Sequence, residues 1–177
     1  MDIKDRAEVT HFVRVAKSYC DHLENFTGDK ETWLKNVLIN LSQLYAAVYS
    51  LPEVELPEVE VLPEEEFEVD NQEWQDVFQF IAMILGEARW YWEYYDPSAL
   101  PKDSEAPGRE DLADDLADIY RDVKPGIRAY DKHANEYIPE IIWNWRETPF
   151  SSHWGIHAAN ALRVLHPLVF LRGLRNS

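Results

Sequence analysis

Apolar residues recur every three or four positions along most of the chain, a spacing that predicts amphipathic helices. The first stretch of this kind covers residues 9–23, and the second runs from about residue 30 to residue 49. Between them, Gly28 can end one helix and Asp29 can cap the next, because an aspartate side chain accepts hydrogen bonds from the free N–H groups of a helix start. The short connection predicts that the two helices form an αα-hairpin.

The helical spacing resumes after residue 70, where Asp70 and Glu73 form a capping box at the start of a third helix. We expect this helix to reach the aromatic run at residues 90–95. The aromatic side chains are either buried on all sides or form an exposed patch, and burial is the arrangement that we expect.

More helical stretches are expected in the second half of the chain, at residues 110–123, 127–134, 138–145 and 152–171. Lys124-Pro125-Gly126 is expected to break or kink the first of them, because proline lacks the N–H that the helix interior needs. No segment alternates apolar and polar residues as a strand would. The sequence therefore predicts an all-α fold, a single-domain bundle of roughly six helices over residues 1–177.

Residues 51–69 interrupt the helical pattern with acidic and proline residues. Leu-Pro-Glu recurs at positions 51, 56 and 62, and prolines at this spacing exclude a helix and a central strand. An extended linker is the expected arrangement. The alternative is a docked edge segment held by its apolar side chains, which are Val54, Leu56, Val59 and Val61. In either case we expect a crossover between helices and not a second domain.

The negative charge of the chain is concentrated in one region. The 177 residues include 33 acids against 17 Lys and Arg, a net charge of −16, and positions 36–88 contain no Lys or Arg. We therefore expect no direct binding to nucleic acid or to an anionic membrane, since both need a basic face. Neither a signal peptide nor a membrane-spanning run is recognised, and Cys20 is the only cysteine, so we expect a cytoplasmic protein.

Four aspartates occupy one face of the helix expected at residues 110–123. Asp111, Asp115, Asp118 and Asp122 follow one another at i, i+4, i+7 and i+11, which places them in a single row. Like charges at this spacing repel one another, and aspartate disfavours a helix interior. Such a row must be solvated, or matched by cations, hydrogen-bond donors or a metal ion.

A second polar row lies on the last expected helix. His153, His157 and Asn160 follow at i, i+4 and i+7, with Arg163 at the edge of the same face. Two imidazoles four residues apart can bind one metal ion, but zinc needs at least a third ligand, and in this chain the aspartates are the ones available. Because both rows flank apolar stripes of one core, we expect them to meet along one groove.

Three interpretations of this groove remain open. In the first, the aspartates pair with Arg121, Arg163 or a histidine in a partly buried polar network. In the second, the groove holds a divalent ion, for which the candidate ligands are Asp115, Asp118, His153 and His157. Oxygen-rich ligation favours magnesium or manganese, whereas two imidazoles favour zinc, iron or manganese. In the third, the acids are a solvated face and the histidines are separate.

Both polar rows belong to a longer sequence pattern. Residues 114–124 read Asp-Asp-Leu-Ala-Asp-Ile-Tyr-Arg-Asp-Val-Lys, followed by Trp145, Phe150, His-Trp-Gly-x-His at 153–157 and Ala-Leu-Arg-x-Leu-His at 161–166. This pattern resembles a bacterial family of small all-helical proteins that is classed only as a domain of unknown function. The resemblance implies a helical fold, no established activity and no catalytic residue to transfer. The Leu-Pro-Glu repeat lies outside the pattern.

The sequence favours a non-enzymatic interaction protein that binds another protein or a small polar ligand, since it holds no self-sufficient catalytic motif. One alternative is a metal-dependent hydrolase of phosphoanhydrides, similar by analogy to all-α nucleotide pyrophosphatases. The Glu-x-x-Glu spacing of those enzymes is missing, and Arg121, Lys124 and Arg163 are the main cations available for such a substrate. The other alternative is an acidic mimic of nucleic acid, supported by the Glu-rich stretch alone. The oligomeric state does not follow from the sequence.

Overall fold

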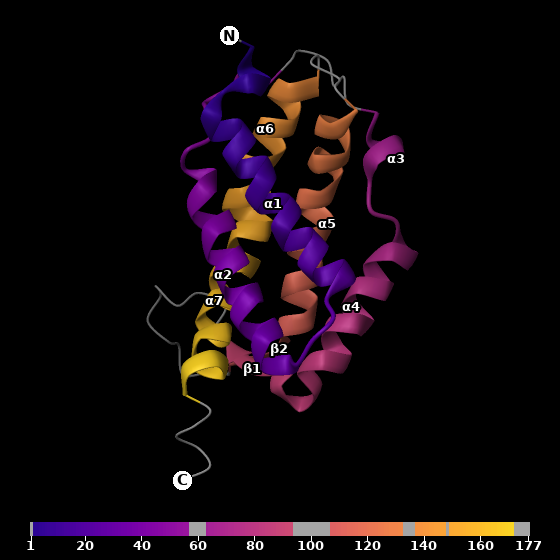
Figure 1. Ribbon diagram of the computed structural model, residues 1–177, viewed down its shortest axis with the longest axis vertical. Coiled ribbons are helices and arrows are strands. Elements are labelled where there is room, and N and C mark those ends of the chain that lie inside the picture. Colours follow the sequence, from indigo (N-terminus) through magenta and orange to yellow (C-terminus); the bar gives the residue numbers. More distant parts are fainter. Residues whose placement is uncertain (1, 57–62, 94–106, 133–136, 148, 172–177) are drawn as a thin grey trace.

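The computed structural model of the chain describes residues 2–56, 63–93, 107–132, 137–147 and 149–171 (Figure 1). Most of these residues lie in helices, which confirms the predicted single-domain helical bundle. The helices are α1 (Ala7–Asn25), α2 (Lys30–Val48), α3 (Glu64–Phe67), α4 (Asn71–Leu85), α5 (Leu112–Asp131), α6 (Ile138–Arg146) and α7 (Gly155–Phe170). Shorter elements are the 3-10 turns Ile3–Asp5 and Gly86–Arg89, the π-helical turn Phe150–Trp154, and the strands β1 (Trp90–Glu93) and β2 (Gly108–Asp111).

Helix α5 occupies the centre of the bundle, because it packs against α1, α3, α4, α6 and α7 (Figure 1). Its predicted apolar stripe is fully buried, at Leu112, Leu116, Ile119 and Val123. Helices α1 and α2 pack against each other as the expected αα-hairpin, and α2 also packs against α7. The long apolar stripes of these helices therefore share one core, and α5 presents a different face to each neighbour.

Two predicted helix caps are present. Asp29 Oδ1 accepts a hydrogen bond from the Thr32 backbone N–H at 2.9 Å, and Asp70 Oδ1 accepts one from Glu73 N–H at 2.8 Å. The Glu73 side chain does not return to the backbone of Asp70, as a complete capping box requires, because it accepts a hydrogen bond from Tyr120 at 2.6 Å.

Of the break or kink predicted at residues 124–126, the break does not occur, because α5 continues through Pro125 and Gly126 to Asp131. A Cβ atom on Gly126 would lie 2.6 Å from the indole ring of Trp145, so the glycine lets α6 approach closely. The Trp145 indole also donates a hydrogen bond to the Val123 carbonyl at 3.2 Å. Tertiary packing by α6 thus holds the helix together where local propensity alone would end it.

The expectation of a strand-free chain is also wrong. Helix α4 ends at Leu85 because Gly86 has a φ of 57°, a conformation that favours glycine. Strand β1 then pairs with β2 in antiparallel register, with Trp90 opposite Asp111 and Trp92 opposite Arg109. The aromatic run is therefore split between the two faces of the strand and is not buried on all sides. Residues 94 and 95 lie outside the described residues.

The acidic crossover is described only at its two ends. Val54 packs against the core whereas Leu56 is 43% exposed, and Val59 and Val61 lie outside the described residues. At the other end, the single turn of α3 follows Pro63 and buries Phe67. No described helix is both long enough and apolar enough for a membrane crossing.

Candidate functional site

The first aspartate of the predicted row does not belong to the site. Asp111 precedes α5 as its N-cap, and its Oδ1 accepts a hydrogen bond from Ala113 N–H at 2.9 Å. Its other oxygen lies 3.4 Å from Arg89 Nε. The row therefore shortens to Asp115, Asp118 and Asp122, which all lie on the side of α5 that faces α7.

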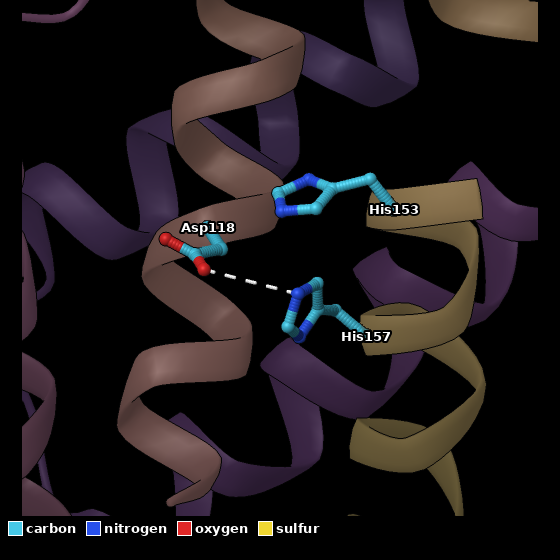
Figure 2. Close-up of side chains that lie close together, drawn as sticks. All are labelled: Asp118, His153 and His157. Carbon is cyan, nitrogen blue, oxygen red and sulfur yellow. Dashed lines mark ion pairs between the residues drawn. The ribbon is translucent and has the colours of Figure 1, made fainter. Parts of the chain in front are cut away.

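The two histidines approach this row from α7 and from the π-helical turn that precedes it. Their imidazole rings lie 4.9 Å apart and both point toward α5, where Asp118 lies (Figure 2). The turn is compact because Gly155 packs onto the Phe150 carbonyl, from which a Cβ atom at residue 155 would be only 2.1 Å away. The sequence expectation that the two rows face one another agrees with this geometry.

Each histidine is oriented through its Nδ1 atom by one aspartate. His157 Nδ1 lies 2.7 Å from Asp115 Oδ1, and His153 Nδ1 lies 2.6 Å from Asp122 Oδ2. An ionised carboxylate only accepts hydrogen bonds, so Nδ1 carries the hydrogen in both rings. In the neutral ring the Nε2 atom then holds the free lone pair, which is the arrangement of a metal-binding histidine.

Asp118 lies opposite both rings. Its Oδ1 accepts hydrogen bonds from Trp74 Nε1 at 2.9 Å and from Arg121 Nη2 at 2.8 Å. Its Oδ2 lies 3.8 Å from His157 Nε2. One ligand atom from each of Asp118, His153 and His157 lies within 4.8 Å of the other two. We call Asp115, Asp118, Asp122, His153 and His157 the α5–α7 site.

Two carboxylates of the site are buried and the third, Asp122, is half-buried, whereas one histidine is open to solvent. Asp115 is 5% exposed and Asp118 is 8% exposed, but the His153 side chain is 44% exposed. A small ligand can therefore reach the site on the His153 side, and the buried carboxylates are held by neighbouring donors.

Two of those donors were missed by sequence reasoning. Tyr91 donates from its hydroxyl to Asp115 Oδ2 at 2.7 Å, and Trp74 donates to Asp118. In the sequence, Tyr91 appeared only as part of the aromatic run. A buried Tyr or Trp usually finds a partner for its polar atom, but the sequence does not tell which of the many acids it meets.

The remaining predicted site residues stand apart. Asn160 is half-buried on α7 and makes no hydrogen bond to the aspartate row within the described part of the chain. Arg163 is exposed, and its guanidinium donates to the Trp92 carbonyl at 3.5 Å and lies 5.5 Å from the Tyr91 ring. Of the two arginines proposed to pair with the aspartates, only Arg121 does so.

The family model for "Domain of unknown function (DUF5063)" matches residues 4–170. The chain belongs to this family. The resemblance noted from the sequence is thereby confirmed, and the DUF5063 description assigns no activity. The crystal structure of protein BF1032 from Bacteroides fragilis has a similar fold, with a TM-score of 0.77 and 25% sequence identity over 95% of this chain and 99% of that chain. No curated protein is similar enough in sequence to count as a match.

Three groups in or beside the α5–α7 site of this DUF5063 chain, His157, Asp122 and Asp114, have a raised pKa. The hydrogen bond to Asp115 raises the pKa of His157 above its ordinary value, against the opposing effect of burial. Burial raises the pKa of Asp122, and the hydrogen bond from His153 partly offsets that effect. Burial and the nearby carboxylates also raise the pKa of Asp114.

These shifts predict how the stability of the metal-free protein depends on pH. A raised folded-state pKa means that protonated His157 stabilises the fold fully below about pH 6.5, its ordinary value, and that this contribution is lost as pH rises through the folded-state pKa. In urea denaturation from pH 5.5 to 8.5 with a chelator, His157→Gln is expected to flatten the fall in the free energy of unfolding. His166→Gln, which changes an exposed histidine on the same helix, should keep the wild-type slope. Equal slopes for the wild type and His157→Gln would show that the Asp115–His157 contact is absent in solution.

A second polar cluster of the DUF5063 chain lies on another face of α5. The Tyr120 hydroxyl lies 2.7 Å from Glu24 and 2.6 Å from Glu73, while Lys124 pairs with Glu24 and Arg128 with Glu73. These residues line a cleft of about 610 Å³. Sequence reasoning missed the cluster, because its members come from α1, α4 and α5. Lys124, which the sequence had suggested as a cation for a phosphate substrate, is paired with Glu24 in this cluster.

Proposed function

We propose that this DUF5063 chain is a non-enzymatic binding protein whose α5–α7 site holds a divalent transition-metal ion through Asp118, His153 and His157. The observation that carries the proposal is the pair of carboxylates on the histidine Nδ1 atoms. Asp115 and Asp122 orient the rings, so the Nε2 lone pairs are available where Asp118 supplies an oxygen. This pattern of a carboxylate behind each histidine is a general feature of protein metal sites.

The donor set selects among metals. Two imidazole nitrogens and one carboxylate suit zinc, iron and manganese, whereas magnesium and calcium prefer oxygen ligands alone. Metal–ligand bonds of about 2.0–2.2 Å bring tetrahedral ligands to about 3.4 Å from one another. His157 Nε2 and Asp118 Oδ2 are already 3.8 Å apart. His153, whose side chain is 44% exposed, would complete the set of ligands.

The charges around the site favour a bound cation over an anionic substrate. Asp114, Asp115, Asp118 and Asp122 surround it, and Arg121 pairs with Asp118 and lies near Asp122. A divalent ion and one guanidinium among four carboxylates leave a net charge of −1. A phosphoanhydride would be repelled by this environment.

The phosphoanhydride hydrolase remains a second candidate because an open metal position can bind and activate water. It has less support, since Lys124 pairs with Glu24 and Arg163 lies beside Trp92. Release of phosphate or pyrophosphate from a nucleoside triphosphate by the metal-loaded protein would favour it. The nucleic-acid mimic has less support still, because Glu53 and Glu66 of the acidic stretch pair with Arg146 and Lys132. A cytoplasmic location also stays a proposal, with which the buried free thiol of Cys20 is compatible.

Metal titration tests the proposal. The protein is stripped with a chelator and then titrated with Zn²⁺, Co²⁺, Mn²⁺, Mg²⁺ and Ca²⁺ in calorimetry and thermal denaturation. A transition metal at about one hundred times its Kd is expected to raise Tm by about 5–10 °C, whereas Mg²⁺ and Ca²⁺ leave it unchanged. Absence of heat and of any Tm shift with all transition metals would contradict the proposal.

A further inference from the structure

The β1–β2 hairpin turns two tryptophans away from the α5–α7 site. Side chains alternate along a strand, so Tyr91 points inward and is 9% exposed, whereas its neighbours Trp90 and Trp92 point outward. Trp92 is 65% exposed, and Arg109 lies opposite it on the paired strand. An exposed tryptophan on a rigid strand pair is a common anchor in protein interfaces.

Two guanidinium groups lie on the ring of one of these tryptophans. Trp90 lies between Arg89, at 4.3 Å from its ring, and Arg109, at 4.0 Å. Stacking on an aromatic ring holds an arginine in place while leaving its edge N–H groups free to bind carboxylates. Arg163, from α7, lies at the margin of these side chains, because it donates to the Trp92 carbonyl at 3.5 Å while its guanidinium lies 5.5 Å from the ring of the inward-pointing Tyr91. We call Trp90, Trp92, Arg109 and Arg163 the hairpin face.

The hairpin face holds cations that lack a carboxylate partner in an acidic chain. The protein has 33 acids for 17 Lys and Arg, and Arg89 pairs with Asp111. Arg109 and Arg163 make no ion pair within the described residues, although both are exposed. In a chain with such an excess of acids, two arginines left without a carboxylate beside an exposed tryptophan are available to a carboxylate from outside.

We infer that the hairpin face binds an acidic peptide segment of a partner protein. The arginines supply bidentate donors for its Asp or Glu side chains, and Trp92 supplies the apolar anchor. Only the hairpin face is complementary in charge to an acidic segment. The net charge of −16 makes most of the remaining surface repel such a segment. A nucleic acid or an anionic membrane needs a larger basic surface than two arginines provide.

A peptide selection tests this inference without a known partner. The purified chain is used to select binders from a random twelve-residue peptide library, with counter-selection against a Trp92→Ala/Arg109→Glu double variant. The recovered peptides are expected to be enriched in Asp and Glu. Failure to recover any peptide, recovery of peptides without acidic enrichment, or stronger binding of a labelled single-stranded oligonucleotide would overturn the inference.

Single variants then locate the surface. Fluorescence anisotropy with a labelled selected peptide is expected to show binding about tenfold or more weaker for Trp92→Ala, Arg109→Glu and Arg163→Glu. The matched controls are Tyr49→Ala, which removes an aromatic ring that is 71% exposed elsewhere, and Arg14→Glu, which reverses an exposed arginine on α1. Equal loss of affinity in the controls and in the hairpin variants would show non-specific charge attraction and overturn the inference.

Discussion

Replacing His157 with alanine is expected to remove metal-dependent stabilisation almost completely. The variant deletes one of three proposed ligands and leaves Asp115 without its imidazole partner. Changing a residue that only hydrogen-bonds a metal ligand weakens metal binding by about 10–100-fold. Loss of a ligand itself is expected to weaken metal binding by more than this. His153→Ala and Asp118→Ala should behave alike, whereas Asp115→Asn and Asp122→Asn should show the smaller loss. Calorimetric titration with the metal that binds the wild type measures all five variants.

His166→Ala is the matched control for these variants. His166 lies on the same helix, is exposed, and contacts Phe170 rather than the aspartate row. Its affinity for metal should equal that of the wild type. If His157→Ala retains wild-type affinity, or if His166→Ala loses as much as His157→Ala does, the ion binds elsewhere and the α5–α7 site is not a metal site.

Gly126→Ala is expected to destabilise the protein, although helix propensity predicts the opposite. Alanine in place of glycine in a helix interior favours the helix by about 1 kcal/mol. The new Cβ, however, would lie 2.6 Å from the buried Trp145 ring, so the indole and the α5–α6 packing must shift. Overpacking of this kind costs about 1–3 kcal/mol. Denaturant unfolding of the wild type and the variant gives the sign directly.

A double-mutant cycle identifies the cause of this loss. In a Trp145→Phe background the smaller ring leaves room for the Cβ, so Gly126→Ala should cost less there than in the wild type. A gain in stability for Gly126→Ala in the wild-type background would show that α6 does not press on α5 at this position. The account of how α5 passes through Pro125 would then be wrong.

The parts of the fold that local chemistry determines were predictable. The apolar spacing located α1, α2 and the start of α4, and Asp29 and Asp70 identified two helix starts. The hairpin was not predictable, because β1 is only four residues long and its partner strand begins fifteen residues after it ends. The pairing of β1 with β2 depends on contacts between distant residues, which the local pattern of apolar residues does not indicate. The continuation of α5 depends likewise on Trp145, which approaches Gly126 only in the folded bundle.

The candidate site was also predictable only in part. The spacing of His153 and His157 and that of the aspartates predicted two rows, and a shared core predicted that they meet. Which aspartate meets which histidine depends on the register of α5 against α7, and the sequence does not contain that register. Asp111 was misplaced because the helix begins at Leu112, two residues later than expected from the acidic run, which makes Asp111 the N-cap.

The central claim is that Asp118, His153 and His157 bind one metal ion, and anomalous diffraction from crystals of the zinc-loaded protein tests it most directly. The account predicts one strong zinc peak between α5 and α7, at about 2.0–2.2 Å from Nε2 of both histidines and from an Asp118 oxygen. Asp115 and Asp122 should remain on the Nδ1 atoms. Zinc found only at other surface residues, with the α5–α7 site still lacking an ion at saturating concentration, would contradict the account.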